Sequence, residues 1–326
     1  MHNVGPAAVS RSALLCGLPA GLALLAVGLA RLLPEQTVWG YALSSLLLSA
    51  PVWLMAIWPV VALLVAWRTG ARLLPMLCAC LGLLFMGHPL PGPEGGAGIF
   101  VVSANVNAFT GAPEALEIAL AELGADAVLI HERRGAQIAG MERVADDFSQ
   151  TLPRASHHAA AFCRVGADCE GHVTEQIGST TMAMPIVFVR LDGELCVVGV
   201  HAPPPYPRDP TGMTPYVAHL GTLIANGRMR AAQGPCRTGD AALLIGDMNA
   251  VPSSTPIRTL PALGLVDALA GTGVFGASWP GGGDWPDLPV LRLDHVFLGA
   301  VSVSGLHHIT LPGSDHRAIG GWYSVH

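Results

Sequence analysis

The chain contains no lysine and few charged residues of any kind. Its 17 basic residues are all arginine, and only 12% of the 326 residues are charged, against about 25% in an ordinary soluble domain. This scarcity of charge excludes a disordered polar chain and a coiled coil. From residue 91 onward, 22 acidic residues stand against 13 arginines. That excess of acid argues against a protein that coats nucleic acid, because phosphates are normally met by positive charge.

Residues 1–88 hold only five charged residues, which predicts a membrane domain with three transmembrane helices. Apolar runs cover residues 13–33, 37–67 and 73–90. About 20 apolar residues span the roughly 30 Å hydrocarbon layer as a helix. The first run is longer than the core of a secretory signal peptide, which has about 7–15 residues. The second run is too short for two spans, so we expect one tilted or kinked helix around Pro51 and Pro59.

The arginines near these runs predict how the chain is oriented. Arg11 precedes the first run, and Arg68 and Arg72 lie between the second and the third. The positive-inside rule places them in the cytoplasm. We therefore expect a multi-pass protein of the cell membrane whose C-terminal part lies outside the cytoplasm. A linker rich in proline and glycine (residues 89–98) precedes that part, residues 99–326, which is long enough for one sizeable core.

Four cysteines lie in the C-terminal part, and no zinc-type CxxC motif occurs among them. They are Cys163, Cys169, Cys196 and Cys236. An even number suits an exported protein, and the first two could close a small loop in an oxidising compartment. Unpaired buried thiols fit the spacing equally well, so the pairing stays open.

Strand-like and helical stretches alternate in the C-terminal part, which is typical of an α/β or α+β sandwich. Pro113 opens a stretch with helical spacing up to residue 123, and a second helix is expected over 216–229. The sequence Asp192-Gly193 between two apolar runs predicts a hairpin. Strands are expected over 99–104, 127–130, 186–190, 195–200, 241–245, 293–298, 301–309 and 317–325.

Polar side chains recur where these strands begin or end. They are Asn105 and Asn107, His131 and Glu132, His201, Asp247 and Asn249, Asp294 and His295, and Ser314, Asp315 and His316. Because the ends of neighbouring strands meet along one edge of a sheet, these groups can converge. Carboxylates suit a hard cation, asparagines form neutral hydrogen bonds and histidines move protons. This set favours metal-assisted phosphoryl hydrolysis.

Five motifs that contain these residues resemble the endonuclease/exonuclease/phosphatase superfamily. They are Ser103-Ala104-Asn105-Val106-Asn107, the element at Glu132, Gly246-Asp247-Met248-Asn249-Ala250, Leu293-Asp294-His295-Val296 and Gly313-Ser314-Asp315-His316-Arg317. Each is weak alone, but together they follow the order of the family. The apolar N-terminal part, residues 253–258 and Ser278-Trp279-Pro280 look most like membrane-anchored bacterial members of the teicoplanin-resistance type, which links the chain to antibiotic resistance. The sequence departs from the family at His131, where glutamine is usual, and at Met248.

The resemblance implies a four-layer sandwich, with two facing sheets between helices, and a magnesium site. Glu132 would be the main ligand of Mg²⁺, with Mn²⁺ as a possible substitute. Asn105 and Asp315 would help to hold the ion. One or two protein carboxylates suffice, since Mg²⁺ keeps several of its waters.

The resemblance also implies roles in catalysis. Asp247 would align or deprotonate the attacking water, and Asn249 would hold the phosphate. Asp294 would orient His316 and keep it basic. His201 would contact the substrate and act as the general acid for the leaving oxygen, but the sequence does not identify a carboxylate partner for it.

Structural roles compete with some of these assignments. Asp247 could cap a helix that follows Pro252, and Asn249 could hold a turn. His201 could belong to loop structure, whereas His131 and His295 favour a structural role or one behind the metal ligands. Trp279 and Trp285 fit substrate contact, core packing or interfacial anchoring.

The expected substrate is a lipid-linked phosphate at the outer membrane face, such as an isoprenoid pyrophosphate or a phospholipid headgroup. An anchor in the bilayer would raise the concentration of the site against such substrates. Nucleic acid is a less favoured partner, and no obligate protein partner is expected. An extracytoplasmic nuclease is the enzymatic alternative, and a degenerate domain that binds a lipid or the cell wall is the non-enzymatic one.

Overall fold

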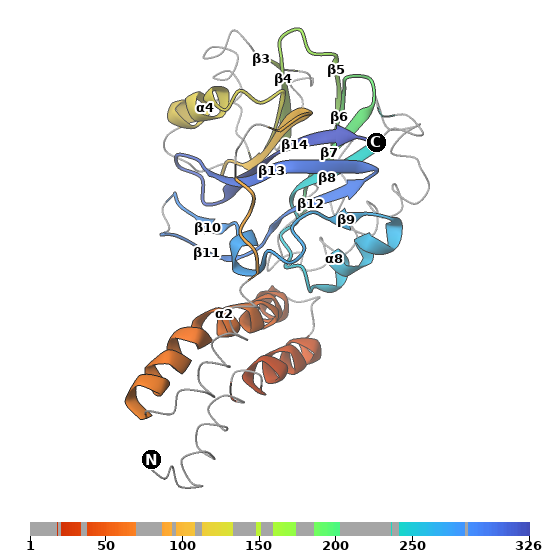
Figure 1. Cartoon of the computed structure of the whole chain (residues 1–326). Coiled ribbons are helices and arrows are strands. Elements are labelled where there is room, and N and C mark those ends of the chain that lie inside the picture. The colour runs from red at the N-terminus through yellow and green to blue at the C-terminus, as the bar shows by residue number, and fades with distance from the viewer. Residues whose placement is uncertain are drawn as a thin grey trace. The chain divides into compact units, whose positions relative to one another are not determined.

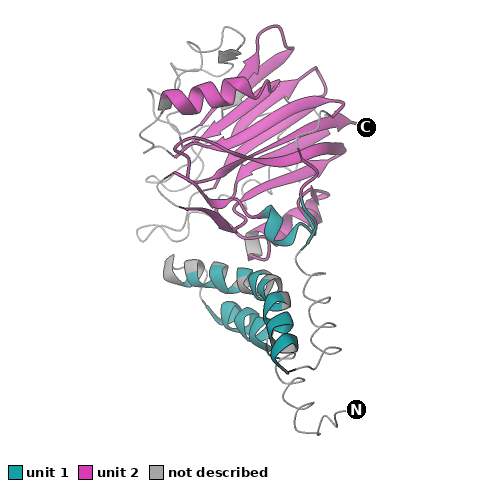
Figure 2. Ribbon diagram, turned by 60° about the vertical axis from the view of Figure 1, so that its left-hand side comes forward, with its two compact units in different colours: residues 1–89, 270–276 teal, residues 90–269, 277–326 magenta. Residues whose placement is uncertain are grey.

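The chain folds into two compact units in the computed structural model. The first comprises residues 1–89 and 270–276, and the second comprises residues 90–269 and 277–326 (Figure 2). The structure describes residues 18, 21–33, 38–69, 87–92, 96–107, 113–132, 148–150, 159–173, 186–202, 236, 241–283 and 286–326. Each unit is described by itself below.

The first unit contains helices in the two apolar runs that the structure describes. One covers residues 21–32, and α2 (Val38–Thr69) is a single helix through Pro51 and Pro59, as predicted. In the described part of the chain, no helix is both long and apolar enough to cross a membrane. The three predicted transmembrane helices are therefore not supported, and the third run lies outside the described residues except for its last four.

A short segment from far along the sequence completes the first unit. Residues 270–276 include η2 (Gly273–Gly276), a single 3₁₀ turn. The backbone N–H of His88 donates to the carbonyl of Gly271 at 3.1 Å. No local sequence pattern predicts this contact, because the two segments lie about 180 residues apart.

Two six-stranded sheets form the frame of the second unit (Figure 1). The first has the order β13-β14-β1-β2-β4-β3, with β1 (Ile99–Asn105), β2 (Ala127–His131), β3 (Phe148–Gln150), β4 (Ala159–Arg164), β13 (Val301–Thr310) and β14 (Arg317–Val325). The second has the order β5-β6-β7-β8-β12-β9, with β5 (Cys169–Val173), β6 (Val187–Leu191), β7 (Leu195–His201), β8 (Ala241–Asp247), β9 (Val266–Asp267) and β12 (Asp294–Gly299). In these two sheets β1 pairs with β2, and β7 with β8, in parallel, and the other pairs are antiparallel.

Smaller elements lie between β8 and β12 along the chain. β10 (Trp279–Gly281) and β11 (Asp287–Leu291) form a separate hairpin. The single-turn helix α8 (Thr255–Thr259) runs directly into η1 (Leu260–Leu263). The eight predicted strands are all present, with ends shifted by at most two residues, whereas β3, β4, β5, β9, β10 and β11 were not predicted.

Alternation along the strands gives each sheet a buried inner face, and the two inner faces share one apolar core. That core includes Val101 and Leu129 from the first sheet and Val197, Leu243 and Ile245 from the second. A second core lies on the outer face of the first sheet. There Leu116 and Leu120 of α4 (Pro113–Glu122) pack over Val102 and Val128. The result is a mixed α/β sandwich with a helix outside one sheet; the other predicted helix, residues 216–229, lies outside the described residues.

Candidate active site

The strand pairing brings the predicted polar residues to one end of the sandwich. In the first sheet, Asn105 of β1 is paired with His131 of β2. In the second sheet, Asp247 of β8 lies between His201 of β7 and Asp294 of β12. The side chain of Asn105 donates from Nδ2 to Oδ2 of Asp247 at 3.0 Å, so a buried hydrogen bond joins the two sheets at this point.

Asp247 is the centre of the site. Its Oδ1 accepts from the backbone N–H of Asn249 at 2.7 Å, and its Oδ2 also accepts from Nδ2 of Asn249 at 3.3 Å. The same Nδ2 donates to the carbonyl of Ala202 at 2.8 Å. Asn249 therefore fixes the Asp247 carboxylate and ties the loops that follow β7 and β8. Its predicted contact with phosphate remains a prediction.

Unusual backbone conformations gather around this carboxylate. Glu132, Asn107 and Asn249 have positive φ angles of 57°, 47° and 47°, a region that non-glycine residues seldom occupy and that recurs at functional sites. Gly246 has a φ of 142°, and a Cβ there would collide with the carbonyl of Val200 on the neighbouring strand. The glycine before Asp247 is thus required by the backbone.

His316 is held between two buried carboxylates. Its Nδ1 lies 2.8 Å from Oδ2 of Asp294, and its Nε2 lies 3.7 Å from Oδ2 of Asp247. Burial lowers the pKa of this imidazole, but the charges of Asp294 and Asp247 outweigh burial and raise the pKa to about 10. Burial raises the pKa of Asp294, yet the charge and hydrogen bond of His316 leave that pKa below its ordinary value. The predicted orientation of His316 by Asp294 is the geometry observed.

His201 faces the same carboxylate from the other side. Its Nε2 lies 3.1 Å from Oε1 of Glu132 and 3.7 Å from Oδ2 of Asp247. Burial opposes ionisation of Glu132, but hydrogen bonding and charge from His201 prevail and lower the pKa of Glu132 to about 2. Burial lowers the pKa of His201, but the hydrogen bond that its ring donates to Glu132, with the charges of Asp247 and Glu132, raises the pKa above its ordinary value.

Asp247 has the opposite shift from Glu132. Burial raises its pKa to about 6, and the nearby charge of Asp294 adds to the effect against the opposing charges of His316 and His201. A carboxyl group with such a pKa can accept a proton near neutral pH and release it again. The site thus combines two ionised carboxylates, Glu132 and Asp294, a third carboxylate that can exchange a proton, and two basic imidazoles.

The donor set fits a hard divalent cation. Two groups of ligand atoms lie within 4.8 Å of one another, Glu132 with His201 and Asp247, and Asp247 with Asp294 and His316. Glu132 is the most open of these, with its side chain 30% exposed. Carboxylate oxygens at an opening where several waters can remain suit a small cation such as Mg²⁺. Asn105 lies beside the first group through its hydrogen bond to Asp247.

Asp315 was also predicted as a metal ligand, but it belongs to neither group. Its Oδ2 accepts instead from Nε1 of Trp279 at 3.3 Å. Trp279 thereby contacts a residue next to His316, while Trp285 lies outside the described residues.

Two serines hold the site together, although the sequence suggested no separate role for them. The hydroxyl of Ser278 accepts from the backbone N–H groups of Leu293 and Asp294 at 3.2 and 3.1 Å. The hydroxyl of Ser314 lies 2.6 Å from the carbonyl of Asn105, to which it donates, and accepts from the N–H of His316 at 3.0 Å. A serine two residues before a histidine is a signal for such a local turn.

The sequence as a whole matches a known family over the sandwich. The model of the Endonuclease/Exonuclease/phosphatase family matches residues 91–316. The chain belongs to this family. It is therefore a hydrolase of phosphoric esters that depends on a divalent metal, as the motifs predicted. The resemblance to a membrane-anchored branch remains a prediction. No curated protein matches the chain.

Solved structures share the fold of this family member at low sequence identity. A family protein from Bacteroides thetaiotaomicron has a TM-score of 0.53 at 13% identity, covering 70% of this chain and 95% of its own. A mannosyl-6-phosphatase from the same organism has a TM-score of 0.52 at 13% identity, over 69% and 99%. TDP2 of D. rerio, solved with a single-strand DNA product, has a TM-score of 0.51 at 17% identity, over 71% and 100%.

Proposed function

We propose that the protein is a membrane-attached, extracytoplasmic, Mg²⁺-dependent hydrolase of a lipid-linked phosphate. The proposed hydrolysis rests on one observation: two carboxylates and two imidazoles converge on Asp247. Glu132 and His201 lie on one side of it, and Asp294 and His316 on the other. These side chains together can transfer protons and stabilise negative charge.

The chain's own residues supply the proton transfers. Asp247 accepts a proton from the attacking water, whose oxygen bonds to phosphorus. His201 gives a proton to the oxygen of the leaving group as the bond from phosphorus to that oxygen breaks. His316, whose Nδ1 is hydrogen-bonded to Asp294, presents Nε2 to the negative charge on the phosphoryl oxygens. Mg²⁺ held by Glu132, with Asn105 and Asp247 nearby, would polarise a phosphate oxygen and neutralise charge.

Attachment to a bilayer is supported by the first unit. Large apolar side chains along both described helices are exposed, among them Leu32 at 81% and Trp67 at 80%. Between residues 38 and 67 there is no charged residue. Soluble monomers seldom carry so many exposed large apolar side chains on two helices, and a lipid phase would cover them. We infer that a lipid bilayer covers these apolar side chains, because the few charged residues of this part lie near the ends of the apolar runs.

Export is supported by the cysteines. Disulfides join Cys163 to Cys169 and Cys196 to Cys236, and such bonds persist mainly in oxidising compartments. The pairing left open by the spacing is thus assigned in the structure. Together with the arginine distribution around the apolar runs, it favours a catalytic unit outside the cytoplasm.

A nuclease is the second candidate, because TDP2 of D. rerio was solved with a single-strand DNA product. The excess of 22 acidic residues over 13 arginines beyond residue 90 weighs against a long polyanionic substrate. For that reason we place the lipid-linked phosphate first.

The test is phosphate or ester hydrolysis by the purified full chain in detergent micelles. The substrates are a chromogenic phosphate ester, lipid pyrophosphates, phospholipids and DNA, each with Mg²⁺ and with a chelator. We expect chelator-sensitive hydrolysis with lipid substrates preferred. Glu132→Ala, Asp247→Ala and His316→Ala should each lower kcat by about 100-fold or more.

Glu194→Ala is the matched control, since Glu194 is an exposed carboxylate in the turn between β6 and β7. It should retain the kcat of the wild-type chain. Hydrolysis of DNA without any hydrolysis of lipid phosphates would establish the nuclease instead. Lack of hydrolysis on every substrate, with lipid binding intact, would indicate the non-catalytic binding domain.

A further inference from the structure

His131 is buried beside the site, and the proposed mechanism assigns no role to it. It ends β2, one residue before Glu132, and has no exposed surface. Among the residues that the structure describes, neither of its ring nitrogens has a hydrogen-bond partner. Leaving a buried polar group unsatisfied costs about 1–3 kcal/mol, and such groups are few in native proteins. Two of them on one imidazole require an explanation.

His201, on the opposite sheet, also has a buried ring nitrogen that lacks a partner. Both of its ring nitrogens are buried. Nε2 lies 3.1 Å from Oε1 of Glu132, although not in good hydrogen-bond alignment, whereas Nδ1 has no polar partner among the residues that the structure describes. In the hydrolases that use a histidine, the nitrogen that faces away from the substrate is normally held by another group, which fixes the tautomer. His316 has such a partner in Asp294, and His201 has no carboxylate in that position.

The two unsatisfied imidazoles are neighbours. The ring centroids of His131 and His201 are 6.0 Å apart, and the ring planes are tilted by 48°. Gly199 lies two residues before His201, and a Cβ there would come within 3.5 Å of Cε1 of His131 and would collide with Leu129. The absence of a side chain at Gly199 thus makes room for Leu129, and His131 lies at ordinary contact distance from the same point.

We propose that His131 is a positioning residue for His201, joined to Nδ1 of His201 by a hydrogen bond through one buried water. The water satisfies a nitrogen on each ring, as buried waters do between polar groups too far apart for direct contact. The bond holds His201 in the tautomer and orientation that direct Nε2 toward Glu132 and the substrate. This role rests on the proposed function, in which His201 protonates the leaving oxygen.

Two substitutions separate this role from plain packing. His131→Leu keeps the bulk of the side chain and removes its hydrogen bonds, while His131→Gln keeps a donor and an acceptor. We expect His131→Leu in the full chain to lower kcat by about 10- to 100-fold, the range for groups that orient a ligand or catalytic side chain. KM and the Mg²⁺ concentration for half-maximal activity should stay within twofold, and His131→Gln should restore most of kcat.

Stability gives a second readout. His131→Leu removes the one ring nitrogen of His131 that the water leaves unsatisfied, but it also takes one hydrogen bond from that water. These two effects on stability oppose each other, so the variant should unfold near the temperature of the wild-type chain. His307→Gln is the matched control. His307 stacks on Phe100 on the outer face of the first sheet, where α4 packs, and the change should leave kcat unaltered.

A third readout does not depend on activity. In ¹⁵N-histidine-labelled protein, the Nδ1 signal of His201 should move in His131→Leu and stay near its wild-type position in His307→Gln. An unmoved signal, equal losses of kcat in the leucine and glutamine variants, or a loss that follows the Mg²⁺ requirement or the unfolding temperature would overturn the proposal. If the wild-type chain proves inactive, the proposed function fails, and the ¹⁵N signal still decides whether the two rings are joined.

Discussion

In the proposed mechanism, Asp294 acts on the reaction only through the imidazole of His316. Its Oδ2 lies 2.8 Å from Nδ1 of His316, and both side chains are buried. In Asp294→Asn the amide cannot provide the negative charge and can present a donor where an acceptor is needed. His316 would then change tautomer, and its pKa would fall from about 10 toward the ordinary value. We expect kcat to fall by about 100-fold or more, with KM changed much less.

Steady-state kinetics on the chromogenic ester measure both constants. Asp267→Asn provides the comparison, since Asp267 also accepts a hydrogen bond from a cation, Arg292, but lies on β9 outside the cluster. It should cost stability and leave kcat of the folded enzyme near that of the wild type. A kcat for Asp294→Asn within about threefold of the wild-type value would remove Asp294 from the mechanism.

His295, one residue further along β12, has a structural role and gives a pH-dependent stability. Its Nε2 lies 2.7 Å from the carbonyl of Ala250, consistent with a neutral ring that donates there. Burial, helped by the charge of Arg292, lowers the pKa of His295 to about 4. The unfolded chain takes up this proton near pH 6.5, so the contribution to stability is complete above that pH and is lost as the pH falls toward 4. The loss amounts to about 3 kcal/mol.

Denaturant unfolding at a series of pH values checks this expectation. His295→Asn retains a donor for Ala250 and has no proton to gain, so its free energy of unfolding should fall less steeply than that of the wild-type chain between pH 6.5 and 4. Parallel curves for the two proteins would show that His295 is already protonated in the folded state.

At the scale of strands and helices, the sequence predicted the elements whose pattern is local. β1, β2, β7 and β8 are apolar runs that end in a polar residue, and the family motifs lie at those ends, so most of the site could be predicted. β4 was missed because Ala159–Arg164 is rich in alanine, which has low strand propensity. Its place in the sheet comes from pairing with β2, which no local pattern encodes.

The same limit applies to the side chains. Glu132 and His316 could be assigned from their motifs, but the approach of Asn249 to the carbonyl of Ala202 and the pairing of Asp315 with Trp279 depend on contacts across long separations. His131 could be noted only as a departure from the family. Its significance comes from the opposite sheet, where His201 has an unsatisfied nitrogen.

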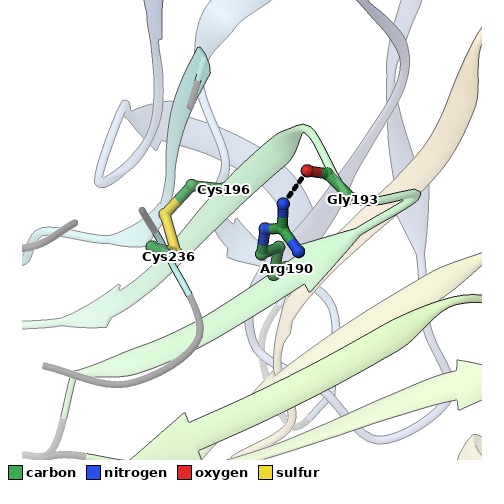
Figure 3. The surroundings of a disulfide bond; sticks show 4 residues. All are labelled: Arg190, Gly193, Cys196 and Cys236. Atoms are coloured by element: carbon green, nitrogen blue, oxygen red, sulfur yellow. Dashed lines mark hydrogen bonds between the residues drawn. A yellow bond between two sulfur atoms is a disulfide. The ribbon is translucent and has the colours of Figure 1, made fainter. Parts of the chain in front are cut away.

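The disulfide Cys196–Cys236 ties β7 to a segment 40 residues later (Figure 3). A loop of that length loses much conformational entropy in the unfolded chain when it is closed, so the bond stabilises the fold by about 4 kcal/mol. Cys236→Ser should lower the free energy of unfolding by about that amount. Cys169→Ser opens a loop with a separation of only six residues and should cost about 2 kcal/mol. Urea unfolding without reductant measures both, and equal losses would contradict the loop-entropy account.

For the whole molecule, the question is why an apolar first unit accompanies a hydrolase. The first unit includes residues 270–276, which lie within the sequence of the sandwich, so it consists of more than the N-terminal segment of the chain. A sequence pattern could not show this, because the segment is short and its partners lie far away along the chain. If the first unit lies in a bilayer, substrates in the same bilayer meet the active site at a raised effective concentration.

Reconstitution in vesicles tests that arrangement. With the full chain and a lipid pyrophosphate in the same vesicles, hydrolysis should be about 100-fold faster than with the two in separate vesicles, because attachment makes the encounter intramolecular within the surface. A water-soluble chromogenic ester, supplied to both preparations, should be hydrolysed at one rate and so controls for the amount of active enzyme. If the lipid is hydrolysed equally fast in both arrangements, the apolar unit does not serve to bring the enzyme to its substrate. The catalytic cluster would then act on a phosphate that reaches it through water.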